Sequence, residues 1–344
     1  MGFYFADYFR KVRVLQCTQV FFHGYILKET LKKNSMNNSI KREDELTCSR
    51  KKFIVNAAKT AGAVALLTLP GAAWAGSTGF PQKQYTVQEI IDMILKEVPD
   101  APFRQTVDTI KSGRADQPVT GIVTTMFTTI EVIQQAIKLK ANFIIAHEPT
   151  YYNHLDDVNW VKDNRIQQQK QELLQKNNIT VWRFHDYCHA LKPDAISYGV
   201  VKKLDWLSEY KTGERMITIP GVTLKELVTH VKSSLGITHV KVIGDLKQHC
   251  ERIALLPGAW GGQLQVTTAE NEKPDVLIVG ELQEWETAEY IRDARALGSS
   301  ISLIILGHSV SEEPGMAWVA EWLQPKVPEL SIHHLASGDP FMWI

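Results

Sequence analysis

Three short apolar segments of the chain each lead into residues that commonly bind metal ions. The segments are residues 142–146, 179–184 and 301–306. The histidines and glutamates that follow them are His147, Glu148, His185, His189, His308 and Glu312. Imidazole and carboxylate groups are ligands that proteins offer to zinc and other divalent metals, so their repeated position after an apolar segment indicates a metal site.

These apolar segments are predicted to be buried strands of an α/β fold. They are rich in β-branched and aromatic residues and are separated by helical stretches, which is typical of parallel strands. In open α/β sheets the loops at the carboxyl ends of the strands converge on one crevice, where ligands bind. The four histidines and two glutamates are therefore expected to meet there.

Each of these residues also has an ordinary explanation when it is considered alone. A pair such as His147 and Glu148 lies more often in a polar loop than in a site. Pro314 fits the first turn of a helix, which places His308 and Glu312 in the preceding loop, where Glu312 would complement the helix dipole. Ordinary core or surface roles are expected for the remaining histidines after residue 75, which are His154, His230, His239, His249, His333 and His334.

The composition is that of an ordinary globular protein. The chain has 344 residues, of which 44% are hydrophobic and 22% charged, and its formal net charge is zero. This balance argues against a nucleic-acid partner, which requires a basic surface. The four cysteines form no Cys-x-x-Cys pair. Cys188 is expected to be a packing residue, and a single bridge between Cys188 and Cys250 is the alternative.

Residues 1–75 have the features of an export signal. A basic stretch at residues 50–52 precedes an apolar run at residues 57–69 and a small-residue motif that ends at Ala75. This order is the anatomy of a secretory signal, and the apolar run is short for a bilayer span. We expect cleavage after Ala75, export to the periplasm or another space outside the cytoplasm, and no stable membrane anchor.

Two points about this leader stay open. Residues 1–35 would precede the true start if the start codon is misassigned, and the sequence Ser-Arg-Lys-Lys-Phe at residues 49–53 resembles the twin-arginine export motif without its Arg-Arg pair. General secretion is the alternative route. If residues 57–69 are instead a buried Ala-rich helix, the protein is cytoplasmic.

The rest of the chain alternates strands and helices, which predicts two α/β lobes. A linker at residues 76–84 precedes a first lobe at residues 85–205 and a second at residues 214–344. Mostly parallel or mixed sheets flanked by helices are expected, with the metal site at the carboxyl ends of the strands, between the lobes. Turns are predicted at Pro220–Gly221 and at Gly258–Gly262, where a phosphate cradle is the alternative.

The motifs at the strand ends resemble those of the Nif-three-like family, also called type 2 GTP cyclohydrolase I or dinuclear metal centre hexameric proteins. Members carry a strand ending His-His-Pro, a later strand ending His-x-x-x-Asp, and a C-terminal Gly-His-x-x-x-Glu. The similar segments here are residues 147–149, 185–189, 275–281, 307–312 and 338–341. The resemblance covers residues 85–344 and agrees in order and spacing.

Two positions depart from the family pattern. Glu148 stands where the family has its second histidine, and His189 stands where it has an aspartate. The resemblance then implies a ligand set of three histidines and two carboxylates: His147, Glu148, His189, His308 and Glu312. Imidazole does not bridge two metals as a carboxylate does, so Glu312 is the best bridging residue, and His185 is the expected proton-transfer residue.

We therefore expect an exported protein with one or two divalent ions, for which nitrogen and oxygen ligands suit zinc, iron, manganese or nickel. If it is an enzyme, a water activated by the ion would hydrolyse a phosphoester, an amide or a purine ring of a small-molecule substrate. The resemblance implies GTP ring opening and a homohexamer, although an exported protein would rarely meet GTP. The rival interpretation is a metal carrier, chaperone or assembly scaffold without turnover, whose ion would have no open coordination position.

Overall fold

The computed structural model describes residues 83–344. The predicted leader at residues 1–75 and residues 76–82 of the predicted linker lie outside this range. The described part begins with α3 (Val87–Leu95), where Thr86 forms a capping box with Glu89 at the start of the helix. None of the described helices is long and apolar enough to cross a membrane.

The first lobe contains a mixed five-stranded sheet in the order β1-β4-β3-β2-β10. Its strands are β1 (Ile110–Ser112), β2 (Ile122–Thr125), β3 (Phe143–Ala146), β4 (Thr180–Arg183) and β10 (Ile332–His334). The four strands β4, β3, β2 and β10 are parallel, and β1 lies antiparallel to β4 at the edge. The carboxyl ends of β3 and β4 therefore open on the same side of the lobe.

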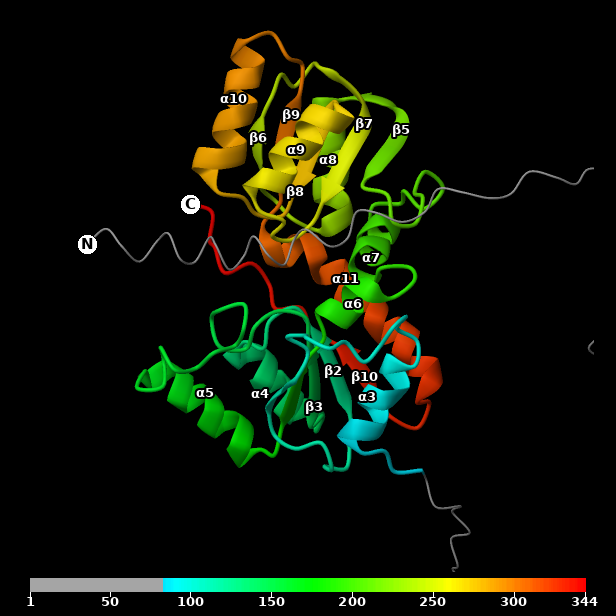
Figure 1. Cartoon of the computed structure of the whole chain (residues 1–344), viewed down its shortest axis with the longest axis vertical. Helices are drawn as coiled ribbons and strands as arrows, with labels where there is room; N and C mark the ends of the chain where they lie inside the picture. The colour runs from blue at the N-terminus through cyan, green and yellow to red at the C-terminus, as the bar shows by residue number, and fades with distance from the viewer. Residues whose placement is uncertain (1–82) are drawn as a thin grey trace, which may run out of the picture. The chain divides into compact units, whose positions relative to one another are not determined.

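The second lobe contains another mixed five-stranded sheet, in the order β5-β7-β8-β9-β6. Its strands are β5 (Met216–Thr223), β6 (Lys241–Ile243), β7 (His249–Leu256), β8 (Val276–Val279) and β9 (Ser302–Ile305). The central strands β7, β8 and β9 are parallel, and both edge strands are antiparallel to their neighbours. The two mixed sheets flanked by helices confirm the predicted fold class (Figure 1).

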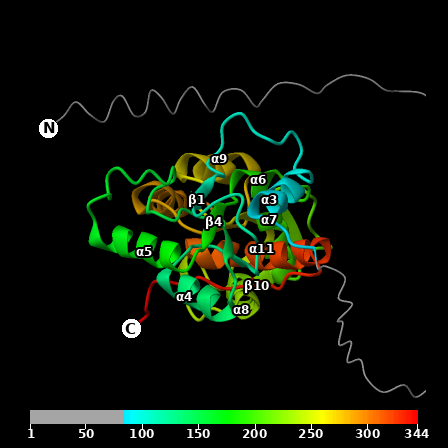
Figure 2. The ribbon, with the colours of Figure 1, turned by 90° about the horizontal axis from the view of Figure 1, so that it is seen from below.

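Helices cover both faces of each sheet. The helices around the first sheet are α4 (Ile130–Leu139), α5 (Arg165–Lys176), α6 (Asp186–Ala190) and α7 (Ala195–Lys203), besides α3. The second lobe adds α8 (Leu224–Leu235), α9 (Gly262–Glu272), a π-helical turn η1 (Glu284–Ala288) and α10 (Glu289–Ala296). Apolar residues of α4 and α5 pack against one face of the first sheet, and those of α3 against the other (Figure 2).

The helix α11 (His308–Leu323) connects the two lobes, followed by the short 3-10 helix η2 (Gln324–Lys326). It leaves the second sheet after β9, packs along α7, and leads to β10 in the first sheet (Figure 1). Gly199 and Gly315 lie at the crossing with α7, where a Cβ on either glycine would collide with the backbone of the other helix. Residues 332–334, which the sequence placed in the second lobe, therefore belong to the first sheet.

Two local predictions, each based on a proline, were wrong. Pro314 lies inside α11 rather than in its first turn, and His308 and Glu312 are helical residues rather than loop residues. Close packing of the helices at Gly315 offsets the single backbone hydrogen bond that Pro314 cannot make. Pro220 lies within β5 rather than in a turn, which an edge strand tolerates because its outer N–H groups need no partner in the sheet.

Candidate metal centre

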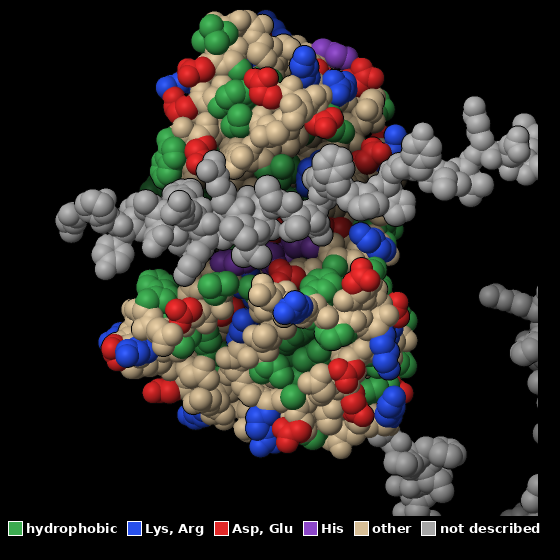
Figure 3. Space-filling view, viewed as in Figure 1, with side chains coloured by type: hydrophobic (Ala, Val, Ile, Leu, Met, Phe, Trp, Pro, Cys, Tyr) green, Lys and Arg blue, Asp and Glu red, His purple; other side chains and the backbone are tan. Residues whose placement is uncertain are grey.

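The structure brings all six sequence-predicted site residues together at the carboxyl ends of β3, β4 and β9. His147 and Glu148 directly follow β3, and His185 follows β4 by two residues. His189 lies in α6, a short helix where the sequence suggested a loop. The two residues from the second lobe occupy the first turns of α11. Figure 3 shows histidine side chains gathered between the two lobes.

Four of these side chains face one another at distances typical of ligands around one ion. The Nε2 atom of His308 lies 3.2 Å from Glu312 Oε2 and 3.4 Å from Glu148 Oε1. The Nε2 atom of His147 lies 3.8 Å from Glu312 Oε2 and 4.0 Å from Glu148 Oε1. Ligand atoms about 2.0–2.1 Å from a tetrahedral ion lie about 3.4 Å apart. His147, Glu148 and Glu312 form a candidate group for a divalent metal, with ligand atoms within 4.8 Å of one another, and His308 contacts both carboxylates of this group.

The histidines His185 and His189 lie beside this group. The ring of His185 stacks on that of His147 with centroids 4.8 Å apart, and the ring of His189 lies 5.0 Å from His147 in an edge orientation. His185 Nε2 is also 3.7 Å from Glu148 Oε1. Ligand atoms of the three histidines lie within 4.8 Å of one another, so His147 is shared between two possible ligand groups.

In all four histidines the Nδ1 atom is hydrogen-bonded to an oxygen acceptor. The acceptors are the Phe184 carbonyl for His147 (3.0 Å), Asp186 for His185 (2.9 Å), Asp194 for His189 (3.0 Å) and Glu281 for His308 (3.2 Å). A carbonyl or carboxylate oxygen only accepts, so Nδ1 carries the proton in each ring and Nε2 is the atom left to bind a metal. Such outer partners fix the ring orientation in known metal sites.

Two buried polar atoms of the cluster have no hydrogen-bond partner. These are Nε2 of His147 and Oε2 of Glu312, whose residues are 0% and 3% exposed. Buried polar atoms are almost always paired, because an unpaired one loses its hydration without compensation. A divalent ion between these atoms would satisfy both. This observation supports a metal centre most directly, and the assignment of the individual ligands stays a prediction.

The charges of the cluster suit a cation. Burial holds the pKa of His147 well below its usual value, so this ring is neutral at pH 7, the form that binds metals. Burial alone would raise the pKa of Glu148, but the hydrogen bond from His308 and nearby positive charge lower it to about 2. Burial would likewise lower the pKa of His308, and the carboxylates of Glu148, Glu281 and Glu312 raise it to about 12. Without an ion His308 therefore carries a proton on Nε2 at pH 7, and a metal that binds there must displace this proton.

Two supports of the centre were missed by the sequence interpretation. Arg183 is fully buried, lies 3.6 Å from both Glu148 and Asp156, and donates hydrogen bonds to the carbonyl oxygens of His147 and His154. The other support is Gly258, where the sequence placed a turn with no link to the metal site. A Cβ there would collide with the Glu312 carboxylate, so this position requires glycine.

A cavity of about 800 Å³ opens beside the cluster and is lined by residues of both lobes. Trp260 and His154 belong to this lining, and the ring of His154 lies 5.4 Å from that of His185. An ordinary role was expected for His154, because nothing in the spacing of residues 149–164 indicates that this loop returns to the site. The cavity is large enough for a small-molecule substrate.

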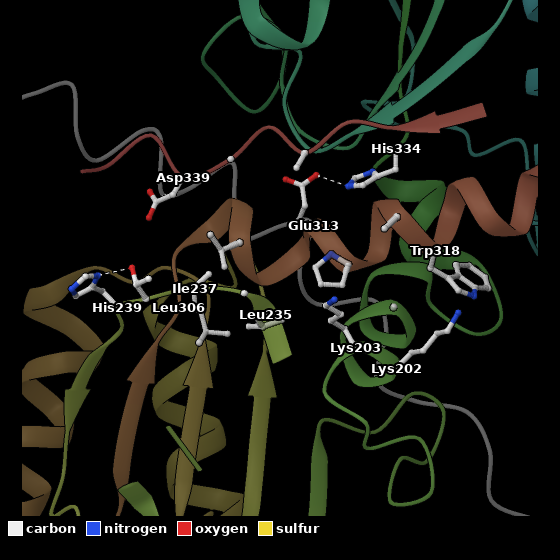
Figure 4. Close-up of a pocket in the computed structure, with 18 of the residues that line it drawn as sticks. Lys202, Lys203, Leu235, Ile237, His239, Leu306, Glu313, Trp318, His334 and Asp339 are labelled. Carbon is white, nitrogen blue, oxygen red and sulfur yellow. Dashed lines mark hydrogen bonds and ion pairs between the residues drawn. The ribbon is translucent and has the colours of Figure 1, made fainter. Parts of the chain in front are cut away.

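A second cavity, of about 770 Å³, lies along α11 and has a different lining. Glu313 and His334 face each other across 3.1 Å at one end, and Lys202, Lys203 and Trp318 lie at the other (Figure 4). None of the six predicted site residues lines it.

The two cysteines of the described part, Cys188 and Cys250, are both free and buried. The alternative disulfide between them is therefore absent. Cys188 is fully buried within the main hydrophobic core, and burial raises the pKa of its thiol well above the usual value. It is a packing residue rather than a thiolate ligand, as the sequence predicted.

Comparison with known proteins agrees with the resemblance seen in the motifs. The family model described as Duf34/NIF3 (NGG1p interacting factor 3) matches residues 85–340. A Clostridium perfringens protein named GTP cyclohydrolase 1 type 2 homolog is 23% identical over 266 residues, which are 73% of this chain and 97% of that protein. A Clostridium acetobutylicum protein of the same name is 24% identical over 233 residues, 64% of this chain and 82% of its own.

Solved structures show the same fold. A Bacillus cereus protein related to NIF3 superposes with a TM-score of 0.62 at 18% identity, covering 76% of this chain and 100% of its own. A Staphylococcus aureus protein superposes with a TM-score of 0.59 at 18% identity, covering 76% of this chain and 99% of its own.

Proposed function

Because the chain belongs to the Duf34/NIF3 family, we propose that it is a metal-dependent hydrolase of small molecules. The proposed ligands of one divalent ion are His147, Glu148, His308 and Glu312. The observation that carries the proposal is a pair of buried atoms that make no hydrogen bond, His147 Nε2 and Glu312 Oε2, which lie 3.8 Å apart. Glu312 Oε2 also lies 3.2 Å from His308 Nε2, a third atom that the ion would contact.

Charge and geometry favour the position of this ion. The two carboxylates of Glu148 and Glu312 balance the charge of one divalent cation, which matters because an uncompensated charge in a buried place is costly. The three-histidine group offers no carboxylate. Since Nδ1 of His147 donates to the Phe184 carbonyl, His147 has one free nitrogen and can bind in only one of the two groups.

The other two histidines are then available for proton transfer and substrate contacts. His185 and His189 both line the 800 Å³ cavity, and the Asp186 carboxylate holds the His185 ring through Nδ1. His185 Nε2 is therefore positioned to take up or release a proton at the cavity wall. A bound divalent ion supplies Lewis-acid chemistry and lowers the pKa of water, which is the chemistry that hydrolysis needs at neutral pH.

The substrate classes proposed are phosphoesters, amides and purine rings. GTP is included among the test substrates because the clostridial relatives are named GTP cyclohydrolase 1 type 2 homologs. The protein would be loaded separately with zinc, iron, manganese and nickel and assayed against these classes, with EDTA-treated protein and a His185→Asn variant alongside. Metal-dependent turnover that His185→Asn lowers by about a hundredfold would support the proposal. Stoichiometric metal without turnover in any class would point to a carrier or scaffold instead.

Export and hexameric assembly are proposed from the leader at residues 1–75 and from the family resemblance. A tagged chain should appear outside the cytoplasm with Gly76 as its N-terminal residue, which N-terminal sequencing reads directly. The mature protein should sediment with the mass of six copies.

A further inference from the structure

The wall of the 800 Å³ cavity carries a second polar group of residues in the first lobe. It consists of Lys170 on α5 and of Thr128 and Thr150 on the loops that follow β2 and β3. We call these three residues the Lys170 subsite. They are distinct from the proposed metal ligands but line the same cavity.

Lys170 is a buried cation without a paired carboxylate. Its side chain belongs to a residue that is 5% exposed, and no carboxylate lies within ion-pair distance among the residues the structure describes. Asp156, whose charge acts on Lys170, forms its ion pairs with Lys111 and Arg183 instead. A buried charge without a partner is costly, so a lysine in this position is typical of a site that receives an anion.

The ammonium group of Lys170 has spare donors. Nζ donates one hydrogen bond, to the Thr150 carbonyl at 2.6 Å, and a lysine has three protons to donate. The rings of Tyr152 and Tyr151 lie 5.3 and 5.9 Å from Nζ, which stabilises the charge without using the donors. Burial lowers the pKa of Lys170 to about 8, so the group is still mostly protonated at pH 7.

The two threonine hydroxyls are independent evidence for a ligand. Thr128 and Thr150 are 0% and 1% exposed, and neither Oγ1 atom has a hydrogen-bond partner. Most buried hydroxyls are paired. Both threonines line the same cavity as Lys170, and Thr150 is in contact with its ammonium group. Together the three residues offer the hydrogen-bond donors that an oxyanion accepts.

The distance to the metal centre suits one small molecule. Thr150 follows Glu148 by two residues, so their Cα atoms are at most about 7 Å apart. Lys170 Nζ lies 2.6 Å from the Thr150 carbonyl oxygen. The Lys170 subsite and the proposed ligands His308, Glu148 and Glu312 line the same cavity, so one small molecule in it can contact both.

We infer that the Lys170 subsite binds a carboxylate or phosphate group of the substrate while the reacting bond lies at the metal centre. The inference rests on the proposed function. It narrows the substrates to molecules in which a short chain separates a terminal oxyanion from the bond that is hydrolysed. Anchoring a remote group in this way orients the reacting bond.

The test is a titration of the zinc-loaded protein by calorimetry. The probes are linear dicarboxylates from succinate to suberate, monocarboxylates of matching length, and phosphonocarboxylates of matching length. One carboxylate is expected at the zinc, and the second acid group at the Lys170 subsite. The best dicarboxylate should bind at least about tenfold more tightly than its monocarboxylate, as one charged hydrogen bond implies. A tighter phosphonocarboxylate would assign phosphate, and a weaker one carboxylate.

Three variants test whether the Lys170 subsite causes the difference in affinity between the dicarboxylate and the monocarboxylate, expressed as the ratio of the two affinities. Lys170→Met should bring the ratio of the two affinities close to one. Thr128→Val should lower it about threefold or more without harming the fold, because the hydroxyl has no partner to lose. Lys176→Met, at an exposed position on the same helix, should keep the full ratio. A ratio near one in the unaltered protein, or a full ratio in Lys170→Met, would overturn the inference.

A metal-free experiment tests the Lys170 subsite independently of the proposed metal centre. If the protein takes up no zinc, the subsite is tested alone with inorganic phosphate and EDTA-treated protein. Phosphate should then bind at least about tenfold more weakly to Lys170→Met than to Lys176→Met. Equal affinities would refute the subsite whatever the metal result.

Discussion

The exchange of two residues relative to the family pattern has a structural explanation in Arg183. Its guanidinium lies 3.6 Å from Glu148, so a carboxylate at this position completes a buried ion pair. His189 is held by Asp194 at 3.0 Å and is grouped with His147 and His185, not with Glu148 and Glu312. By the family resemblance, a carboxylate at residue 148 would replace the one that the family pattern has at residue 189.

Restoring the family residues singly should upset metal binding. Glu148→His leaves one carboxylate in the centre and also removes a partner of Arg183, so the free energy of unfolding should fall by roughly 1–3 kcal/mol. His189→Asp adds a third carboxylate and should shift preference from zinc towards manganese. The double variant should bind two ions per chain, and the unaltered protein one. Metal analysis of all four proteins is the measurement. Equal stoichiometry in all four would mean that residue 148 binds no ion and that an aspartate at residue 189 adds no ligand.

Lys170 predicts a specific dependence of stability on pH. Its pKa is about 8 in the folded protein and near 10.5 when unfolded, so between these values only the unfolded chain keeps the proton. The stability therefore rises with pH across this window, by at most about 1.4 kcal/mol per pH unit. In Lys170→Met this rise should be absent. Denaturant unfolding of both proteins from pH 7 to 10.5 gives the difference, and parallel curves would be inconsistent with a depressed pKa.

The site residues were largely predictable from the sequence because each follows an apolar strand, and strand ends converge. His147, Glu148 and His308 could be found in this way. Lys170 and Arg183 could not, because a lysine in a Gln-rich helix and an arginine at the end of a strand look like ordinary surface residues in sequence. Only the tertiary packing shows that both are buried.

At the scale of elements, the turn after β7 positions the helix α11. Gly258 has φ +76° and its backbone lies against the Glu312 carboxylate, while its N–H donates to Ser311 Oγ at 2.9 Å. The sequence predicted a turn here but gave no sign of what the turn touches. The positions of helices and strands could be predicted from hydrophobic periodicity. The predictions based on Pro314 and Pro220 were wrong, because helix packing overrides the local preference of Pro314 and an edge position in the sheet overrides that of Pro220.

Gly258→Ala should therefore cost both stability and metal binding. The backbone strain of a positive φ costs on the order of 1 kcal/mol, and the added methyl group must also push Glu312 away from the centre. Gly236→Ala is the matched control, because Gly236 has φ +70° and an added Cβ would meet nothing within 4 Å. Zinc affinity should fall at least about tenfold in Gly258→Ala only. A similar loss in both variants would mean that strain alone is responsible.

At the scale of the whole molecule, the return of β10 to the first sheet ties the two lobes together. A strand of three residues at the edge gives no distinct sequence signal, so the predicted boundary at residue 214 assigned it to the second lobe. Because α11 carries His308 and Glu312 and connects the two sheets, these two proposed ligands lie on an element that is anchored in both lobes.

The described residues should fold without the leader. A chain that begins at Gly76 is expected to have the melting temperature of the full chain within about 2 °C, because a change below about 0.5 kcal/mol shifts the midpoint of a domain of this size by no more. Differential scanning calorimetry of the two chains is the comparison. A large drop would show that residues 57–69 are a core helix and would remove the basis for proposing export.

The metal centre is tested most directly by X-ray absorption at the zinc edge of the zinc-loaded protein. The account predicts nitrogen and oxygen ligands at about 2.0–2.1 Å with the scattering pattern of imidazole, and no sulfur at about 2.3 Å. The signal should be lost in His147→Ala, which removes the ligand that both possible groups share. Sulfur ligands, or a shell of oxygen atoms without imidazole, would contradict the account.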